Sequence, residues 1–415
     1  MRQKGCPGID TMQEVEILML MYIDDLCIFS DNVIDLQRKI NVLSSYCNEY
    51  GLEINLTKSK VMVIRNGGVV KKSEKWYYNG TLIDVVSYYS YLGVIVSSRL
   101  MWSKHIDNMS SKAHQIISRI VYMCNHFDHV PMKMLFKIFD GKIKPILLYG
   151  SEIWGVRKYE DIEKVHLRFC KVVLGVGKTT WNFAAIGECG RYPLYVEYHV
   201  RAIKYWCKLV TTEESRYNSK CYKLLYKLDA AGRKNWASEM RSLLCCLGYG
   251  IAWYSQTIGD IKAFICEIRE RLLSISCQEW YGRVDHLCPE YLCYQPSPFA
   301  VSYTRIINSY HRRRLFALLR TKGLPIKNNL LRLNIVYNNL CEKCNGIYVE
   351  NEYHILFRCT KYKNEREKYL PTSLTTNPSI EKLNNVLISE DATLVKNIID
   401  YLQEIMKNRE YTKDN

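Results

Sequence analysis

The sequence predicts an α+β fold, with a small sheet followed by a mostly helical region and a compact cysteine–histidine segment. Near the start, two apolar runs are separated by a pair of aspartates, a pattern typical of a hairpin between two strands. From residue 103 onward, apolar residues recur at every third or fourth position, which is the period of amphipathic helices. Near the end, residues 341–359 gather three cysteines and a histidine.

The small sheet is predicted from the first hundred residues. The apolar runs 17–23 and 26–29 predict paired strands, and residues 33–47 carry apolar side chains on one helical face before Gly51 ends the helix. Residues 52–64 predict another strand, and residues 89–98 a strand or tight hairpin. Hairpin, helix and strand in this order are half of a split βαβ unit, so we expect a partial sheet of the ferredoxin-like kind.

Helices are predicted for most of the remaining chain. A helix of about six turns starts at Ser103, a second starts at Pro131, and a third stops near Gly175. The helical pattern continues from 196 to 285, and residues 309–320 predict a basic helix with leucines on one side. After residue 370 the chain becomes polar, and we expect a tail with only a short final helix.

Composition limits the classes of protein to consider. The chain has 415 residues, of which 48% are hydrophobic, so we expect a folded protein with several domains. The longest apolar run, Ile17–Ile23, is too short to span a bilayer, and the start resembles no signal peptide. We therefore expect an intracellular protein, in the nucleus or the cytoplasm, that is independent of membranes. Its 17 cysteines, without a disulfide-like rhythm, are expected to be reduced.

The net charge of +16 favours a polyanionic partner, above all RNA or DNA. The alternative interpretation is a coding bias towards Lys, Asn and Tyr, which would carry the charge without a partner. The oligomeric state cannot be predicted from these features.

The stretch YIDD, at Tyr22–Asp25, places two carboxylates at the tip of a hairpin whose apolar strands we expect to be buried. Carboxylates are the hard oxygen ligands that Mg²⁺ prefers, and a hairpin turn can present both to the same ion. Asp24 and Asp25 are therefore candidate Mg²⁺ ligands. The alternative is that the pair belongs to an ordinary polar turn.

A second candidate metal site has the spacing C-x₂-C-x₉-H-x₄-C, formed by Cys341, Cys344, His354 and Cys359. Thiolate and imidazole ligands in this number predict a closed, structural Zn²⁺ site. The alternative is that these are four ordinary buried side chains.

A basic helix precedes this candidate zinc site. Its arginines Arg312, Arg313 and Arg314 could contact nucleic-acid phosphates, or could form a solvated helix face.

Several stretches, in this order, resemble the reverse transcriptases of non-LTR (LINE-like) retrotransposons. They are YIDD at 22–25, GLEINLTKSKVMVI at 51–64, YSYLGVIVSS at 89–98, KPILLYGSEIWG at 144–155, QEWYGRV at 278–284 and ENEYHILFRCTKY at 350–362. The resemblance implies that Asp24 and Asp25 hold catalytic Mg²⁺ and that Lys58 lies near the incoming triphosphate. It also implies that Tyr91, Leu92 and Gly93 hold the primer end.

The same resemblance implies a domain organisation. Residues 1–101 would be a partial palm, 102–195 a helical thumb, 196–330 a helical connector, 331–370 a zinc knuckle and 371–415 the polar tail. The family's earlier carboxylate motif and its fingers have no counterpart in residues 1–21. We therefore expect an N-terminally truncated member of the RNA-directed DNA polymerase family, inactive alone, with an RNA template and a DNA primer as partners. The alternative is a non-catalytic nucleic-acid-binding protein that uses the thumb and the zinc knuckle.

Overall fold

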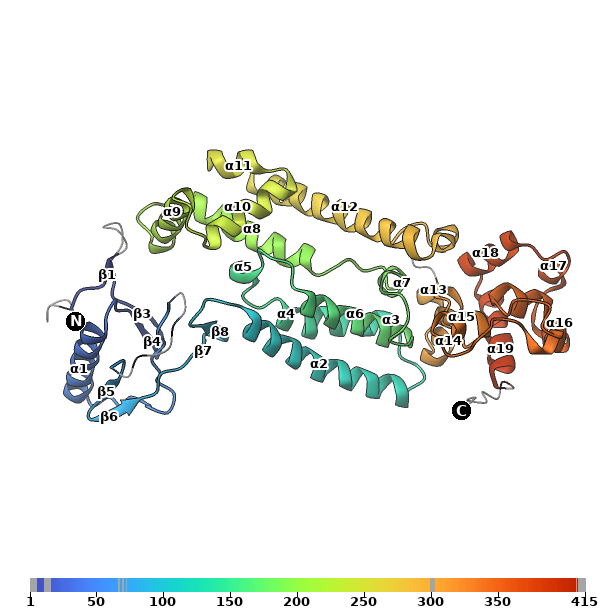
Figure 1. Ribbon diagram of the computed structural model, residues 1–415, viewed down its shortest axis with the longest axis horizontal. Coiled ribbons are helices and arrows are strands. Elements are labelled where there is room, and N and C mark those ends of the chain that lie inside the picture. The colour runs from blue at the N-terminus through green and yellow to red at the C-terminus, as the bar shows by residue number, and fades with distance from the viewer. Residues whose placement is uncertain are drawn as a thin grey trace. The chain divides into compact units, whose positions relative to one another are not determined.

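The computed structural model describes residues 6–10, 16–65, 68, 71, 73–298, 303–407 and 409. The fold is α+β, with short antiparallel strand pairs in the first hundred residues and helices through most of the rest (Figure 1). The chain divides into two compact units. Unit 1 comprises Met1–Met109, Leu148–Lys158 and Glu197–Arg269, and unit 2 comprises Ser110–Leu147, Tyr159–Val196 and Glu270–Asn415.

The strands of the described residues form four separate pairs, β1–β2, β3–β4, β5–β6 and β7–β8. Their bounds are β1 Ile9–Asp10, β2 Glu16–Ile17, β3 Met19–Tyr22, β4 Asp25–Ile28, β5 Trp76–Tyr78, β6 Thr81–Ile83, β7 Tyr88–Tyr91 and β8 Val94–Ser97. The predicted first hairpin is confirmed as β3–β4, and the predicted hairpin at 89–98 as β7–β8. Because the pairs are not joined, the expected split βαβ sheet is not confirmed.

The predicted strand at 52–64 is wrong for most of its length. Only Val61 is in a β-bridge there, a single parallel bridge to Val85. The reason is local: the side-chain oxygen of Asn55 accepts hydrogen bonds from the backbone amides of Thr57 and Lys58 at 3.0 and 3.2 Å. Such a side-chain-to-backbone turn bends the chain in the middle of the predicted strand.

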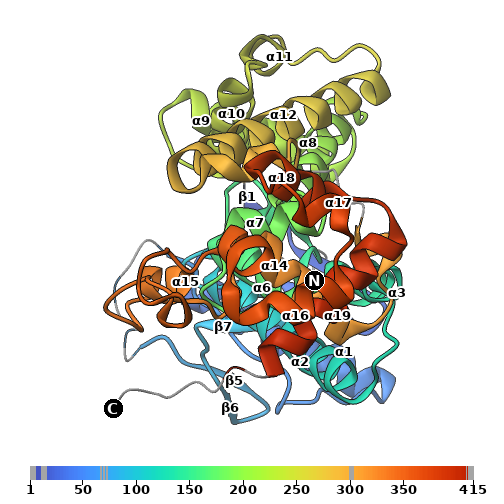
Figure 2. The same ribbon diagram turned by 90° about the vertical axis from the view of Figure 1, so that its right-hand side faces the viewer.

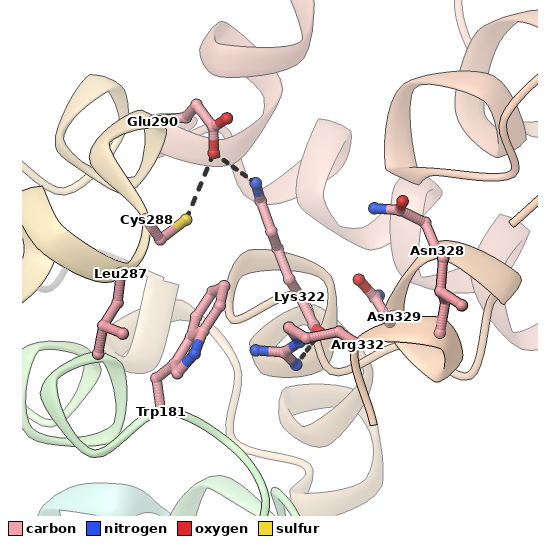
Figure 3. A pocket seen from close by; sticks show the side chains of 9 residues that line it. Trp181, Leu287, Cys288, Glu290, Lys322, Asn328, Asn329 and Arg332 are labelled. Atoms are coloured by element: carbon pink, nitrogen blue, oxygen red, sulfur yellow. Dashed lines mark hydrogen bonds and ion pairs between the residues drawn. The ribbon is translucent and has the colours of Figure 1, made fainter. Parts of the chain in front are cut away.

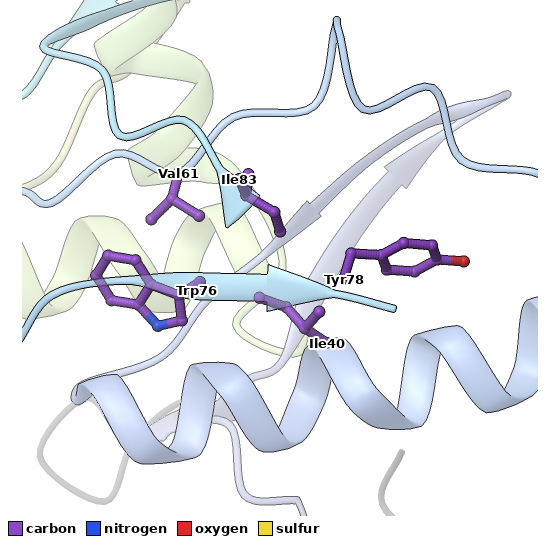
Figure 4. Packing of buried hydrophobic residues seen from close by; sticks show 5 residues of the cluster. All are labelled: Ile40, Val61, Trp76, Tyr78 and Ile83. Carbon is purple, nitrogen blue, oxygen red and sulfur yellow. The ribbon is translucent and has the colours of Figure 1, made fainter. Parts of the chain in front are cut away.

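Helix α1, Val33–Tyr50, supplies the small core of this part of unit 1. The Asn32 side chain caps its start and Gly51, at φ 63°, ends it in the left-handed region. Figure 4 shows Ile40 of α1 facing the buried cluster that it forms with Val61 and with the strand residues Trp76, Tyr78 and Ile83. Truncating a side chain such as Ile40 in this core costs about 2–5 kcal/mol.

The other helices of unit 1 pack around tryptophans. Trp206 and Trp253 are fully buried and stack at a centroid distance of 6.0 Å, and the Trp206 indole donates to the Tyr222 hydroxyl at 2.8 Å. These helices are α5 Ser151–Trp154, α9 Tyr217–Ala230, α10 Trp236–Leu247, α11 Gly250–Ser255 and most of α8 Tyr195–Thr211. Helices α2 Ser103–His126, α8 and α12 Ile261–Leu287 contribute residues to both units.

In unit 2, α14 (Tyr310–Arg320) packs against α6 (Glu160–Leu174) and α19 (Ala392–Lys407) (Figures 1 and 2). The α-helices are α3 Met132–Ile138, α4 Lys144–Leu147, α6 Glu160–Leu174, α7 Asn182–Glu188, α13 Tyr303–Ile306, α14 Tyr310–Arg320, α15 Lys327–Arg332, α16 Lys363–Tyr369, α17 Thr372–Thr375, α18 Ile380–Ile388 and α19 Ala392–Lys407. The π-helices are η2 Phe139–Ile143 and η5 His354–Arg358, and the 3₁₀ helices are η3 Pro289–Cys293, η4 Glu342–Cys344 and η6 Thr360–Tyr362.

The segment after residue 370 is more ordered than the predicted polar tail. Helix α19 has 16 residues, and its buried residues include Val395, Ile398 and Leu402. The Tyr401 hydroxyl donates to the Ile355 carbonyl of η5. The sequence of this segment does contain apolar residues at helical spacing, but the polar residues on both sides led us to predict only a short helix. Asn408 and residues 410–415 of the predicted tail lie outside the described residues.

None of the described helices combines the length and the apolar composition that a bilayer span requires.

Candidate functional site

The two candidate Mg²⁺ ligands lie at the tip of the β3–β4 hairpin. Tyr22 pairs with Asp25 across the hairpin, so Ile23 and Asp24 form its two-residue turn. Ile23 has φ 55° and its side chain is 83% exposed. A β-branched residue in the left-handed region is strained, at a cost of about 1–3 kcal/mol.

Asp24 and Asp25 are both exposed. The sequence suggested a buried hairpin, because the run 17–23 is almost entirely apolar. That inference is wrong: Met21 and Tyr22 are 73% and 59% exposed. The carboxylates therefore stay hydrated. They carry no desolvation cost that a bound metal would have to offset.

The donor set fits a catalytic Mg²⁺ centre only in part. Two adjacent carboxylates are suitable hard ligands. Within the described residues, however, no third carboxylate, cysteine or histidine joins them in a group of metal-binding geometry. Two-metal chemistry needs ligands from more than one strand, so no catalytic step is derived from this hairpin alone.

The β7–β8 turn contains the three candidate primer-contacting residues. Leu92 and Gly93 have φ 48° and 80°, as required by a two-residue turn in which both central residues are left-handed. Next to this turn, burial raises the pKa of Tyr91, and the neighbouring Cys27 thiol and Asp25 carboxylate raise it further. Tyr91 and Asp25 thus lie within electrostatic reach of each other.

A third predicted segment is attached to the same strand. The Tyr89 hydroxyl of β7 donates to the carbonyl of Lys58 at 3.0 Å, which holds the turn that carries Lys58. The Lys58 side chain is exposed, and in the described part of the chain it forms no ion pair with either aspartate. The structure therefore brings the Lys58 backbone to β7 without closing a lysine–carboxylate pair.

Tyr149, which the sequence analysis did not single out, also contacts the turn. Its hydroxyl donates to the Leu92 carbonyl at 2.8 Å. A Cβ atom added at Gly93 would lie 3.1 Å from the Tyr149 ring, so a larger residue would require the ring to shift by a few tenths of an ångström. Tyr149 belongs to the stretch KPILLYGSEIWG, whose resemblance to a known motif was the one available signal.

The four predicted zinc ligands converge in unit 2. One ligand atom from each of Cys341, Cys344, His354 and Cys359 lies within 4.8 Å of all the others. Cys344 Sγ is 3.9 Å from Cys359 Sγ and 3.5 Å from His354 Nε2. A tetrahedral Zn²⁺ with Zn–S bonds of about 2.3 Å sets its sulfur ligands about 3.8 Å apart. The residues present therefore fit a structural Zn²⁺ ion.

The local backbone explains how the first two cysteines meet. The Cys341 amide donates to the Tyr348 carbonyl at 2.8 Å, and the Gly346 amide donates to the Cys341 carbonyl at 3.0 Å. Asn345 and Gly346, at φ 54° and 68°, turn the chain through the left-handed region.

Electrostatics also suits metal binding by these side chains. Burial lowers the pKa of His354, which favours the neutral imidazole that binds a metal. Burial raises the pKa of Cys359 to about 12, so its thiolate needs a cation for stabilisation. Burial also acts to raise the pKa of Cys344, but hydrogen bonds led by that from Thr360 lower it overall.

The three arginines predicted to contact phosphates do not form one basic surface. Arg313 is fully buried, and its guanidinium donates to the carbonyls of Val173 and Val130 at 3.0 and 3.1 Å. Arg312 pairs with Asp400 of α19 at 2.7 Å, while Arg314 remains exposed. The geometry assigns Arg313 to the interior, where no phosphate can reach it.

Comparison with known proteins gives a family match for the region that contains the β3–β4 hairpin and residues 91–93. Residues 6–96 match the family model described as reverse transcriptase (RNA-dependent DNA polymerase). The RNA-directed DNA polymerase from mobile element jockey of Drosophila melanogaster is 20% identical over 181 residues, covering 42% of this chain and 19% of that protein. The protein described as "Probable RNA-directed DNA polymerase from transposon BS", from the same organism, is 21% identical over 169 residues, covering 39% and 19%.

A transposon-derived protein of Caenorhabditis elegans is 27% identical over 169 residues, covering 39% of this chain and 57% of that protein. No solved structure matches the chain. The matched region spans about a fifth of the length of the curated polymerases.

The carboxylate hairpin, the 91–93 turn and these likenesses assign residues 6–96 to the reverse transcriptase family. As the order of its sequence motifs predicted, the chain is similar over its matched regions to the reverse transcriptases of non-LTR retrotransposons.

Proposed function

We propose that the β7–β8 hairpin organises the primer-end side of a polymerase palm. The single observation that carries this proposal is the convergence of three segments on the β7–β8 hairpin. Tyr91 lies within electrostatic reach of Asp25, Tyr89 holds the carbonyl of Lys58, and Leu92 accepts a hydrogen bond from Tyr149. In this proposal the four strand pairs are the remnant of a ferredoxin-like palm sheet.

The proposed roles follow the family resemblance. Asp24 and Asp25 would offer oxygen ligands to Mg²⁺, which supplies charge stabilisation to phosphoryl groups when it is bound. The exposed Lys58 ammonium would neutralise a nucleotide triphosphate, and the 91–93 turn would contact the primer backbone. RNA template and DNA primer are the proposed partners, with residues 102–195 as thumb and 196–330 as connector.

Polymerisation by this chain alone is not expected. Among the described residues, Asp24 and Asp25 have no third carboxylate beside them. A centre with too few ligands holds its metals poorly and cannot align attacking and leaving oxygens. The proposal is therefore a polymerase-family chain that binds primed template and does not extend it unaided.

Primer extension on a primed RNA template, with Mg²⁺ or Mn²⁺, tests this proposal. We expect no incorporation by the purified chain. Incorporation that disappears in Asp24→Ala would contradict it, because the hairpin would then support catalysis alone. Incorporation that persists in Asp24→Ala would indicate a contaminating polymerase and require repurification before the comparison.

The second candidate function is non-catalytic nucleic-acid binding through the thumb and the zinc segment, which we propose to be a zinc knuckle at 331–370. The closed, four-ligand cluster favours it, since such a site is structural and has no open position for a substrate. Binding to unprimed single strands as tight as binding to primed template would favour this alternative.

A further inference from the structure

A cleft of about 360 Å³ lies in unit 2, and none of the candidate metal ligands lines it. Its lining includes Trp181 just before α7, Leu287 at the end of α12, Glu290 of η3, Lys322 after α14, and Asn328 and Arg332 of α15 (Figure 3). None of these residues has a role in the proposed polymerase site. A volume near 300 Å³ or more is that of small-molecule and single-base pockets.

Two of the residues that line the cleft, Trp181 and Arg332, form a cation–aromatic pair. The Arg332 guanidinium carbon lies 4.0 Å from the centre of the Trp181 ring. Trp181 also stacks on Phe183, with centroids 5.5 Å apart and planes 19° apart. Arg332 donates from Nη2 to the Lys322 carbonyl at 2.9 Å, while its buried Nε has no hydrogen-bond acceptor among the described residues. The pair is thus held in place and retains an unused donor.

The charges of the cleft are largely balanced within the protein. Lys322 pairs with Glu290 at 2.6 Å, and Oε2 of Glu290 also accepts from the Cys288 thiol. The buried carboxyl of Glu352 interacts electrostatically with both Lys322 and Arg332. A phosphate would have to compete with these carboxylates. A neutral, flat group with polar edges would not.

The walls offer apolar and amide contacts of the kind that such a group needs. Leu287 and Leu331 border the cleft, and the amide of Asn328 borders it from α15. Asn328 Oδ1 already accepts from Asn339 at 3.2 Å, which orients the side chain. Proteins recognise unpaired bases by stacking them on aromatic rings or guanidinium planes and by hydrogen-bonding their edges.

We propose that this Trp181–Arg332 cleft binds a single unpaired nucleobase of a single-stranded nucleic acid. The inference rests on the proposed function for the presence of nucleic acid near the chain, and it adds a base-reading site distinct from the primer-end site. Helix α15 links the cleft to the zinc segment, since the Lys327 amide donates to Glu350 at 2.8 Å.

The test measures binding of the full chain to three probes of equal length: a 12-nucleotide unstructured RNA, the same backbone without bases, and a duplex RNA. We expect Arg332→Gln to weaken binding to the RNA about tenfold, which is the effect of losing one stacked base. The same variant should weaken binding to the base-free backbone about twofold or less. Duplex binding should change no more than the base-free backbone. The matched control is Arg305→Gln, which removes one charge from an exposed arginine of the same unit.

Asn328→Ala provides a second variant if Arg332→Gln unfolds, and we expect it to weaken RNA binding several-fold and leave the base-free backbone unchanged. If both cleft variants lose affinity for the RNA and for the base-free backbone equally, as Arg305→Gln should, the proposal of a base-binding cleft is overturned. If the unaltered chain binds the RNA no more tightly than it binds the base-free backbone, the base-binding cleft is overturned while the proposed function stands. Failure of the unaltered chain to bind any probe would overturn the proposed function together with the cleft.

Discussion

The hydroxyl of Tyr149 donates a hydrogen bond to the carbonyl of Leu92 at 2.8 Å, across 57 residues of sequence. The contact joins the turn proposed to hold the primer end to a stretch that the sequence alone placed in another domain. It also favours glycine at position 93, since φ there is 80° and the Tyr149 ring would lie 3.1 Å from an added Cβ. The turn is therefore fixed from outside its own hairpin.

Replacing Gly93 with alanine should destabilise unit 1 by about 2 kcal/mol, from left-handed strain of about 1 kcal/mol and a further steric term against Tyr149. Gly80→Ala is the matched control. Gly80 also has φ 80°, but nothing lies within 4 Å of its added Cβ. Urea unfolding of both variants separates the free-energy cost of the left-handed backbone from the cost of the contact with Tyr149. Equal losses of stability would show that Tyr149 does not restrict the turn.

Zinc content tests the cluster in unit 2. We expect one Zn²⁺ per chain, lost in Cys344→Ser because a hydroxyl is a poor substitute for a thiolate. Cys246→Ser, at an exposed cysteine outside the cluster, should retain the metal. Metal analysis of the purified proteins measures both. If zinc is retained when Cys341 and Cys344 are both replaced, these residues are ordinary buried cysteines and not zinc ligands.

A chelator should loosen the segment around 337–362 and leave the upstream helices intact, because small metal segments draw much of their folding free energy from the ion. Hydrogen exchange by peptide, with and without chelator, measures this. Protection that is unchanged at 337–362 would argue against a structural metal.

Stability should fall on acidification because of His199. Burial lowers the pKa of His199 to about 4, and its Nδ1–H donates to the Gly155 carbonyl at 2.6 Å. The pKa of a histidine in the unfolded chain is about 6.5. Between pH 6.5 and about pH 4 the unfolded state therefore binds more protons than the folded state, and the free energy of unfolding falls by up to about 3 kcal/mol. Above pH 6.5 the full stability is present.

His199→Gln removes this titration and leaves the carboxylates that both proteins share. The difference in unfolding free energy between the two proteins should therefore shrink by a few kcal/mol between pH 6.5 and pH 4.5, by linkage. A difference that is constant with pH would show that His199 does not titrate with a lowered pKa.

Much of the site could be predicted because its patterns are local. The YIDD hairpin, the two-residue turn at 92–93 and the spacing of the four zinc ligands are each set within a few residues. The arginines at 312–314 show the limit of such reasoning. A basic triplet predicts a surface, but Arg313 caps carbonyls from Val173 and Val130, which are distant in sequence.

The misjudged elements have the same origin. The strand predicted at 52–64 fails because the Asn55 side chain competes for backbone amides, which no apolar pattern reveals. Helix α19 was underestimated because its apolar face becomes meaningful only against α14 and α16. Long-range packing, as between Tyr149 and Leu92, is absent from any local pattern.

Nucleic-acid binding should be steeply salt-dependent. With a net charge of +16, the chain should release several counterions on binding phosphates. For contacts to six or more phosphates, affinity should fall about a thousandfold between 50 and 200 mM salt. Filter binding at the two concentrations measures the change. Undetectable binding at low salt would leave the charge as a coding bias.

The most direct test of the central claim is a photo-cross-link from the primer end. A DNA primer carrying a photoreactive 3′-terminal thymidine is annealed to an RNA template, bound to the chain, irradiated and mapped by mass spectrometry. The account predicts cross-links in peptides that contain Tyr91–Gly93 or Tyr22–Asp25, and their loss when the reactive group is moved ten nucleotides upstream. Cross-links confined to other peptides, or unchanged by that move, would contradict the claim that these two hairpins form one primer-end site.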